Sequence, residues 1–253
     1  MNIKILFQDD YLMALDKPAG LVVDKSGTSS SETLEDILEN EFKINLDRGG
    51  IVHRLDKDTS GVILVAKVQE ALENLQTQFK ERKTKKEYKA LVHGLIEKAG
   101  VVEGNIGRNP RAREKFIVME NDGKEASTEY EVIKQLTVGN EQLAEIFDGF
   151  NKIQMRKLER QNYGDFTLLK VFPKTGRTHQ IRVHLKHIGN PIVADEVYAG
   201  RKTSRVDRRW CPRQFLHAAR LGFYHPKSGE WMEIESPLAE DLKKALKMVK
   251  GQA

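Results

Sequence analysis

The chain has 253 residues, enough to bury a hydrophobic core as one large domain or two small ones. Its composition is ordinary for a soluble protein, it begins without the basic and apolar regions of a signal peptide, and its longest apolar run is far too short to span a bilayer. The single cysteine, Cys211, excludes an intrachain disulfide and a multi-cysteine zinc site, so we expect a cytoplasmic protein.

The net charge of +5 is modest, but the charges are unevenly distributed. Acidic residues gather at 31–41, whereas basic residues gather at 80–89, 107–115 and 201–209. Segregated basic clusters suit a polyanionic partner such as a nucleic acid. Lysine-rich runs are also common on solvated helix faces, and charge alone does not decide between these interpretations.

Apolar periodicity predicts the elements of secondary structure. Turn residues separate short runs rich in β-branched side chains, and four segments show helical spacing instead. In chain order, we expect strands at 3–7 and 11–15, a helix at 34–42 behind a serine-rich start, a strand at 61–67, a helix at 72–79, strands at 88–94, 115–120, 127–133 and 166–172, a helix at 181–188, strands at 215–225 and 230–235, and a helix at 238–249. Gly189 is well placed to end the third helix.

The order of these elements does not alternate strictly between strand and helix, which disfavours a parallel sheet of the Rossmann type. A mixed, mainly antiparallel sheet with helices on its faces fits better. No stretch rich in Pro, Gly or Ser divides the chain, so we expect one domain spanning 1–253. Residues 143–162 lie where a short hairpin loop would suffice, and their apolar residues keep helical spacing, which indicates an amphipathic helical insertion.

The segment HRLDKDTSG, residues 53–61, superficially resembles a calcium-binding loop. Asp56, Asp58 and Gly61 stand at the first, third and sixth positions of such a loop. The twelfth position, which needs a bidentate glutamate, holds Lys67. A calcium site is therefore excluded.

The histidines at 179, 184 and 187 are spaced by five and three residues, which would splay their rings around a helix. Zinc pairs on a helix usually lie four residues apart, so a metal site is not expected. The chain also lacks the glycine-rich motifs that cradle nucleotide phosphates.

What remains is one aspartate in a turn, Asp56, with Arg54, Arg177 and Arg182 as candidate partners. A nearby arginine keeps a carboxylate ionised and orients it. An ionised carboxylate without metal or histidine suits covalent or proton-transfer chemistry at an electrophilic carbon such as a sugar C1′. An Asp–Arg pair that merely pins a turn fits the same residues.

Four blocks of the sequence, in order, resemble the RluA-type RNA pseudouridine synthases. They are GGIVHRLDKDTSGVILVAK, KKEYKALVHG, KTGRTHQIRVHLKHIGNPIVAD and FLHAARLGFYHPKSGEWMEIESPL, and the resemblance extends from DKPAGLVV near the start to about Pro237. It implies an α+β fold whose central mixed, mainly antiparallel sheet is flanked by helices and loops, with a basic active-site cleft. It also implies an isomerase that converts uridine to pseudouridine in rRNA or tRNA without a cofactor or metal.

The resemblance also implies roles for individual residues. Asp56 matches the catalytic aspartate, which attacks C1′, attacks uracil C6 or abstracts the C2′ proton; the sequence leaves all three open. Tyr88 matches the tyrosine that stacks on the target base and helps remove the C5 proton. Arg182 matches the arginine that pairs with the aspartate.

Further residues are expected to bind RNA. The family flips its target uridine out of the helix, at a cost of about a few kcal/mol for unstacking. Arg54 matches an arginine that enters the vacated stack, and Arg177 supports its loop or touches phosphate. His53 shapes the turn beside the RNA. The basic run at 80–89 is expected to contact phosphates, chiefly through Lys83, Lys85 and Lys86.

Three departures from the family pattern are visible. The catalytic pattern begins almost at Met1, so we expect no N-terminal S4-type RNA-binding domain, and recognition of a compact stem-loop by the catalytic domain alone, as a monomer. Asp24 replaces a histidine common in relatives, a change expected to be peripheral. The 143–162 insertion is longer than is usual, and we expect it to take part in RNA selection.

Two other functions compete with this one. A ribosome-assembly factor that binds RNA and has vestigial catalysis would not need Asp56, Tyr88 and Arg182 together. A hydrolase acting on free uridine would not need the basic clusters. A dependence of activity on RNA length would separate the hydrolase of free uridine from the two functions that act on RNA.

Overall fold

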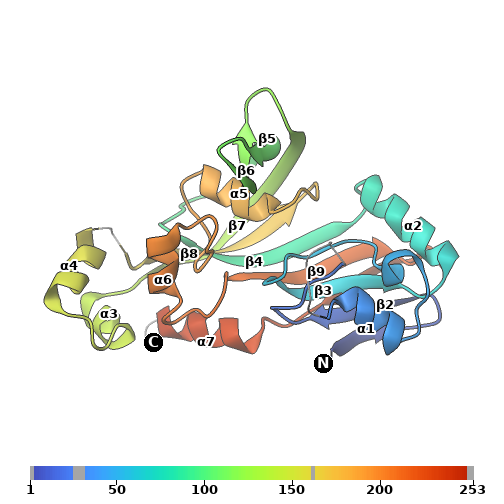
Figure 1. The fold of residues 1–253 in the computed structure, drawn as a ribbon, viewed down its shortest axis with the longest axis horizontal. Helices are drawn as coiled ribbons and strands as arrows, with labels where there is room; N and C mark the ends of the chain where they lie inside the picture. Colours follow the sequence, from blue (N-terminus) through green and yellow to red (C-terminus); the bar gives the residue numbers. More distant parts are fainter. Residues whose placement is uncertain (1–2, 25–31, 161–162, 250–253) are drawn as a thin grey trace. The chain divides into compact units, whose positions relative to one another are not determined.

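The structure is a computed structural model that describes residues 3–24, 32–160 and 163–249 (Figure 1). Its chain clusters into two compact units. The first unit comprises residues 1–87 and 217–237, and the second unit comprises residues 88–216 and 238–253. We expected one domain spanning 1–253, and this stays a prediction; strand β4 (Lys85–His93) runs from the first unit into the second without a linker.

The sheet of the first unit has β2 (Leu12–Lys17) and β3 (Ser60–Ala66) as its buried central strands. Its other members are β1 (Lys4–Gln8), β9 (Leu216–Tyr224) and β10 (Trp231–Glu235). The order is β1-β2-β3-β9, and β10 pairs with β9 outside this path. Every residue of β3 is buried, which explains why its sequence is an unbroken apolar run. Strands β3 and β9 pair in parallel, while β1–β2, β2–β3 and β9–β10 are antiparallel.

The helices of the first unit agree with the apolar spacing. Helix α1 (Leu34–Asn40) starts at a capping box formed by Thr33 and Asp36, and it ends two residues earlier than expected. The serine-rich start lies largely outside the described residues. Helix α2 (Gln69–Lys80) packs its apolar side against β2, β3 and β9 in one core cluster. A short 3-10 turn, η1 (Asp47–Gly50), was not predicted.

The sheet of the second unit is antiparallel in all its described pairs. Beside β4 it contains β5 (Gly100–Asn109), β6 (Ala112–Met119), β7 (Lys124–Thr137) and β8 (Asp165–Pro173), in the order β4-β8-β7-β5-β6. The expected mixed, mainly antiparallel architecture is confirmed. Strand β5 was missed because two glycines and several polar residues interrupt its apolar pattern.

Five helices accompany this sheet. They are α3 (Asn140–Ile146), α4 (Lys152–Arg160), α5 (Gln180–His187), α6 (Arg201–Asp207) and α7 (Glu240–Val249). Helix α5 was predicted, and Gly189 follows its end with a φ of 87°, a left-handed conformation that suits glycine. Helix α7 begins two residues after Leu238, where the pattern placed its start. Helix α6 was missed, because its sequence was interpreted only as a basic cluster.

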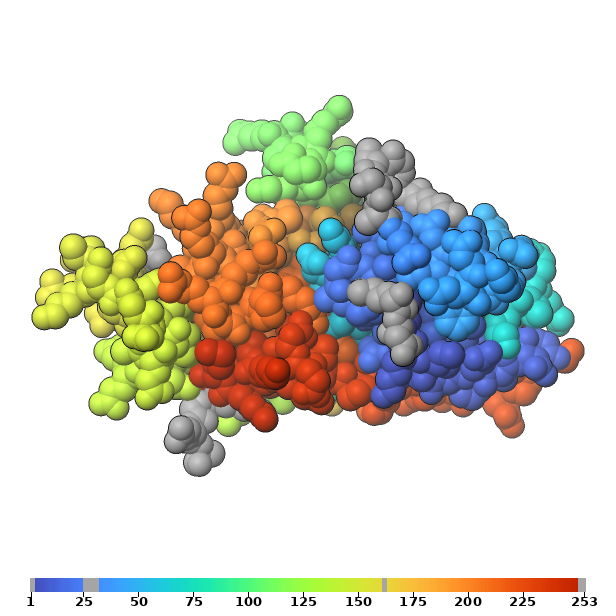
Figure 2. All heavy atoms as spheres, turned by 60° about the horizontal axis from the view of Figure 1, so that its bottom comes forward, coloured from blue at the N-terminus to red at the C-terminus, as the bar shows by residue number. Residues whose placement is uncertain are grey.

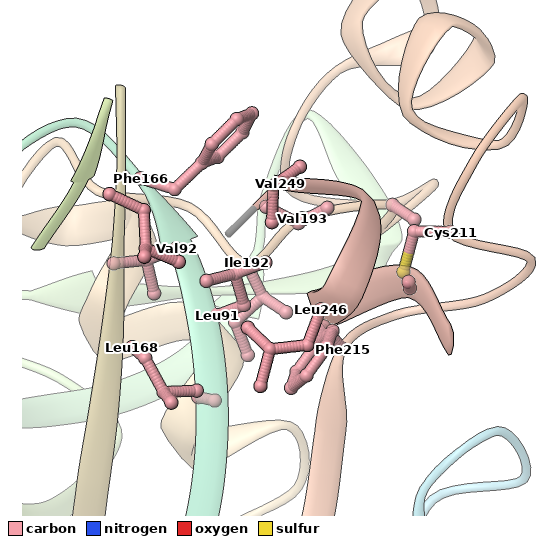
Figure 3. Close-up of a cluster of buried hydrophobic side chains, with 14 of the residues drawn as sticks. Leu91, Val92, Phe166, Leu168, Ile192, Val193, Cys211, Phe215, Leu246 and Val249 are labelled. Carbon is pink, nitrogen blue, oxygen red and sulfur yellow. The ribbon is translucent and has the colours of Figure 1, made fainter. Parts of the chain in front are cut away.

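The expected helical insertion is formed by α3 and α4, which lie between β7 and β8; residues 161–162 are outside the described residues. Its buried side chains, Leu143, Phe147 and Leu158, belong to the main core cluster of the second unit. In Figure 3 the side chains of that cluster converge from β4, β8, α7 and the segments before α6 and β9. Burying a side chain of this size contributes about 1.5–3 kcal/mol.

Candidate active-site residues

Asp56 lies in a tight turn that leads into β3. The backbone N–H of Thr59 donates to the carbonyl of Asp56 at 3.0 Å, which closes the turn over residues 56–59. The carbonyl of Lys57, in the middle of the turn, accepts from the N–H of Gly20 at 2.9 Å. The Asp56 side chain is partly exposed, so a carboxylate on a backbone-fixed turn stands at the surface of the first unit.

A buried lysine is hydrogen-bonded to the backbone of this turn. Lys17, at the end of β2, is 0% exposed, and its Nζ donates to the carbonyls of Pro18 (2.8 Å), Leu21 (2.8 Å) and Lys57 (2.9 Å). A buried ammonium is tolerated only when its hydrogens find acceptors, so these bonds tie the segment 18–21 to the Asp56 turn. We did not single out Lys17 from the sequence, because burial of a lysine leaves no local pattern.

The chain leaving the turn is fixed to β9. The hydroxyl of Ser60 lies 2.9 Å from Nδ1 of His217, and Nε2 of His217 donates to the carbonyl of Ser236 at 3.2 Å. Gly61 has a φ of 114°, and a Cβ there would lie 2.1 Å from the carbonyl oxygen of Ala218. The parallel pairing of β3 and β9 therefore requires glycine at this position.

His53 supports the chain entering the turn. Its ring stacks on Phe79 of α2 at a centroid distance of 4.7 Å, and its Nε2 accepts from the backbone N–H of Leu64 at 3.0 Å. Burial, and then the charge of Lys86, lower the pKa of His53 to about 3. The ring is therefore neutral at physiological pH, with its proton on Nδ1. Its predicted contact with RNA stays a prediction.

Arg54 is exposed and faces an acidic neighbour. Its Nη1 lies 3.5 Å from Oδ2 of Asp24, which also accepts from Nη2 of Arg48 at 2.8 Å. We expected Asp24 to be a peripheral change. That expectation stays a prediction, but the structure places the Asp24 carboxylate beside the arginine predicted to enter the RNA stack.

The three lysines predicted to bind RNA have different surroundings. Lys83 pairs with Glu81 at 2.6 Å, and this partner raises the pKa of Lys83. The Nζ of Lys85 lies over the ring of Trp231 at 5.4 Å, whereas burial, and then Arg82, lower the pKa of Lys86 to about 8. Neighbouring residues of a strand point to opposite faces, so a run of basic letters does not become one basic patch.

Tyr88 and Arg182 belong to the second unit. Tyr88 lies on β4 opposite Val171 of β8, and its partly buried side chain packs against the main core cluster of that unit. Arg182 lies in the first turn of α5 and is 6% exposed. Asp56 belongs to the first unit, so the predicted meeting of Asp56 with Tyr88 and Arg182 stays a prediction.

Arg182 has a buried acidic partner that the sequence analysis missed. Its Nε and Nη2 donate to the two oxygens of Asp195 at 2.7 and 3.0 Å, a bidentate pair that fixes the guanidinium plane. Asp195 is 0% exposed, and its Oδ1 also accepts from the backbone N–H groups of Val197 and Tyr198. An aspartate capping its own turn is a common local pattern, and nothing in its sequence context pointed to Arg182.

Tyr198 covers the face of the same guanidinium. The Cζ of Arg182 lies 5.0 Å from the centre of the Tyr198 ring, within the range of a cation–π contact. The Tyr198 hydroxyl lies 3.0 Å from Nδ1 of His179 and accepts from the N–H of Phe116 at 3.1 Å. Arg182 is thus held along one edge by a carboxylate and across one face by an aromatic ring.

The loop before α5 is held mainly by Gln180 and Arg177. Oε1 of Gln180 accepts from the hydroxyl of Thr175 at 2.6 Å and from the N–H of Arg177 at 3.0 Å, while its Nε2 donates to β7. Nε of Arg177 donates to the carbonyl of Glu125 at 3.0 Å. This geometry supports the loop-supporting role expected for Arg177; its contact with phosphate stays a prediction.

The histidines of α5 and its N-cap do not converge. Nδ1 of His184 bonds with the hydroxyl of Thr128 at 2.9 Å, whereas His179 turns toward Tyr198. Burial, and then the neighbouring His187, lower the pKa of His184 to about 4. Over the part of the chain that the structure describes, no three potential ligands gather as a metal site, and no helix has the length and apolar character to span a membrane.

Comparisons with known proteins agree in one family. The profile of the RNA pseudouridylate synthase family matches residues 11–187. The chain is 41% identical, over 98% of its length, to ribosomal large subunit pseudouridine synthase D of Nitrosomonas europaea, and 42% identical, over 93%, to an uncharacterized RNA pseudouridine synthase of Aquifex aeolicus. It spans about two thirds of the length of these curated relatives, 66% of the first and 70% of the second.

Two solved human structures share the fold. RNA pseudouridylate synthase domain-containing protein 1 aligns with a TM-score of 0.67 and 24% identity, covering 99% of this chain and 96% of the other. Domain-containing protein 4 aligns with a TM-score of 0.68 and 22% identity, covering 97% and 92%. At these identities the likeness concerns the fold alone, and it agrees with the α+β architecture expected from the sequence.

Proposed function

The chain belongs to the RNA pseudouridylate synthase family, and on this premise we propose that it isomerises uridine to pseudouridine in the RNA of the large ribosomal subunit. The observation that carries the proposal is the similarity, over nearly the whole chain, to a protein named for that reaction in that subunit. The same similarity favours ribosomal RNA over transfer RNA as the substrate. We expect the enzyme to act in the cytoplasm as a monomer, without cofactor or metal.

The reaction rearranges one nucleotide and adds nothing to it. The bond from uracil N1 to ribose C1′ breaks, the base turns while it is held, and a bond from C5 to C1′ forms. The C5 proton leaves and N1 gains a proton, so the atoms balance without a water or a cofactor. An enzyme for this reaction has to hold a detached base and supply one reactive group at the sugar or the base.

Asp56 is the group that we assign to the chemistry. Its turn is fixed by backbone bonds, by Lys17 and by the Ser60–His217 contact, so the carboxylate needs little reorganisation when the nucleotide arrives. In this proposal Arg182, oriented by Asp195, pairs with Asp56 and keeps it ionised. Tyr88 stacks on the uracil and assists in removing the C5 proton.

RNA binding has a separate set of residues in this proposal. Arg54 leaves Asp24 and enters the stack that the flipped uridine vacates, which replaces part of the lost stacking energy. Lys83, Lys85 and Lys86 contact phosphates, and Arg177 steadies the loop that leads to α5. An exposed pair such as Arg54–Asp24 is worth about 0.2–1 kcal/mol, so it yields readily to a phosphate or a base.

The experiment that tests the proposal is tritium release from RNA transcribed with [5-³H]uridine. Large-subunit rRNA and tRNA transcripts are tested separately, with Asp56→Asn as the matched control, because it keeps the side-chain shape and removes the charge. We expect release from the rRNA transcript, loss of turnover by at least about a thousandfold in Asp56→Asn, and unchanged RNA affinity in that variant.

The other outcomes are equally informative. Release in both the wild type and Asp56→Asn would remove Asp56 from the chemistry. Release from tRNA alone would overturn the proposed substrate. Salt-sensitive binding without release from either RNA would favour the assembly-factor function over the enzyme.

A further inference from the structure

The outward face of α4 carries a row of cations beside the exposed Ile153, Gln154 and Glu159. Lys152, Arg156 and Arg160 follow one another at intervals of four residues, so they lie in line along the helix, about 6 Å apart per step. All three are exposed, and Lys157 stands beside them, while Leu158 and Met155 turn toward the protein. Like charges at this spacing destabilise an isolated helix, so the sequence retains an unfavourable arrangement.

Helix α6 and the turn that follows it repeat the spacing. Arg201 and Arg205 lie in α6 and Arg209 lies in the following turn; all three are exposed and four residues apart, with Lys202 beside them, and the buried Ser204 and Asp207 mark the opposite side of the helix. In the described structure no carboxylate forms an ion pair with any member of either row. The one basic residue of this segment that is paired, Arg208, contacts Glu196 at 2.5 Å and stands outside the row.

The two rows belong to neighbouring, well-anchored helices. The guanidinium of Arg209 covers the ring of Phe150, in the loop before α4, at 4.5 Å. The Tyr163 hydroxyl, after α4, donates to Oδ1 of Asp207 at 2.7 Å, and Tyr163 also packs edge-on against Phe147. In Figures 1 and 2 the segments that carry α4 (yellow) and α6 (orange) lie next to each other.

The chemistry of this surface selects its ligand. Rows of guanidinium and ammonium groups suit phosphates, and Arg in particular recognises phosphate through its planar fork. The exposed residues of the two rows include no aromatic side chain on which an unpaired base could stack, since Trp210 is buried and Phe150 lies beneath Arg209. These features favour the backbone of a paired stem over a single strand.

We propose that the outward faces of α4 and α6 form a second RNA-binding surface that grips the sugar–phosphate backbone of a stem flanking the target uridine. This inference rests on the proposed function and extends it. Residues 143–162 then select the substrate by its shape, because they place one of the two rows. The surface adds affinity without reading sequence, and Asp56, Tyr88 and Arg182 keep the chemistry.

The test replaces the rows and measures binding separately from turnover. The row variant is the full chain with Lys152→Gln, Arg156→Gln and Arg205→Gln; Arg209 is kept because it packs on Phe150. The matched control, Lys98→Gln, Lys244→Gln and Lys247→Gln, removes the same charge from exposed sites of the second unit. Circular dichroism melts verify that both variants fold.

Affinity for an rRNA stem-loop, and for the isolated loop as a single strand, is measured by fluorescence anisotropy at several salt concentrations. Each lost phosphate contact lowers the slope of log affinity against log salt by about 0.7–0.9. We expect the row variant to lose about 2–3 in slope and at least about tenfold in stem-loop affinity, with the single strand unaffected and turnover at saturating RNA unchanged. The control variant should retain the wild-type slope.

A row variant that binds the stem-loop with the slope of the control would overturn the proposal. Polyglutamate, measured in the same anisotropy assay, serves as an acidic-protein probe. If the row variant lost affinity for polyglutamate but kept full stem-loop affinity, the proposal would also be overturned and the surface would be assigned to an acidic protein. A fault in the proposed function is visible separately, because it would abolish tritium release by the wild type while leaving these binding differences intact.

Discussion

At the scale of single residues, the groups proposed to act are held by partners that have no part in the chemistry. Lys17 bonds to three carbonyls around the Asp56 turn, and Asp195 holds the edge of Arg182. Each partner is a buried ion whose removal would leave polar groups unsatisfied. Sequence motifs identified Asp56 and Arg182, and their buried partners became visible only when the chain was folded.

His53 makes the stability of the protein sensitive to acid. Its pKa is about 3 in the folded chain and 6.5 as the ordinary value, so between these values the unfolded chain binds a proton that the folded chain does not. The stabilisation is complete above about pH 6.5 and is lost as the pH falls toward 3. We expect the free energy of unfolding of the wild type to fall, relative to that of His53→Gln, by up to about 1.4 kcal/mol per pH unit.

Urea denaturation of both proteins at pH 7.5, 6, 5 and 4.5 measures this difference. Glutamine retains an acceptor for the N–H of Leu64, so the comparison isolates the titration of the ring. Parallel curves for the two proteins would mean that His53 titrates normally and that its ring is open to water.

At the scale of elements, packing against neighbouring elements explains most of the agreement and most of the differences between the predicted and the observed helices and strands. The apolar periodicity of α2 survived folding because the helix buries one side against a sheet, and that of α5 because Ile181 and Leu185 enter the main core cluster of the second unit. Strand β5 escaped detection because its pattern is weak, and α6 because its exposed face is almost entirely basic. These elements depend on the neighbours against which they pack, which no local window contains.

Gly61 joins β3 to β9 and should tolerate no side chain. A Cβ would approach the carbonyl oxygen of Ala218 to 2.1 Å, and the φ of 114° is unfavourable for any other residue. We expect Gly61→Ala to lower the free energy of unfolding by about 3 kcal/mol or more, and to lower turnover because the Asp56 turn shifts.

Gly139→Ala is the matched control, because a Cβ there meets no atom within 4 Å and the backbone is ordinary. Because Gly139 is the N-cap of α3, where alanine is less favourable than glycine, the substitution should cost at most about 1 kcal/mol. Thermal melts of the two variants make the comparison. Equal melting temperatures for Gly61→Ala and the wild type would show that β3 and β9 separate easily and that the turn does not depend on their contact.

At the scale of the whole molecule, the two units each have a core, and the proposed chemistry needs residues from both. Asp56 and its supports belong to the first unit, whereas Tyr88, Arg182 and the two basic rows belong to the second. The proposed pairing of Asp56 with Arg182 is therefore a statement about the assembled protein, and it can be measured without reference to activity.

A double-mutant cycle with Asp56→Asn and Arg182→Gln tests that pairing. When two residues share no partners, the changes that their mutations cause in the free energy of unfolding add within about 0.3–0.5 kcal/mol. A direct ion pair gives a coupling energy of about 0.5–3 kcal/mol. We expect coupling within the latter range. A matched cycle combines Asp58→Asn with Arg182→Gln. Asp58 lies two residues after Asp56 in the same turn, and its effect should add to that of Arg182→Gln. Additivity in both cycles would disprove the pairing.

The sequence by itself determined the family, the α+β class with its mainly antiparallel sheet, and the candidates Asp56, Tyr88 and Arg182, because ordered motifs and apolar periodicity are local properties of the chain. Only the tertiary structure revealed that Lys17, Asp195 and His217 hold these groups, that Lys83, Lys85 and Lys86 have unlike environments, and that α4 and α6 align their cations. Burial, pKa and charge alignment depend on residues distant in the sequence, and these come together only on folding.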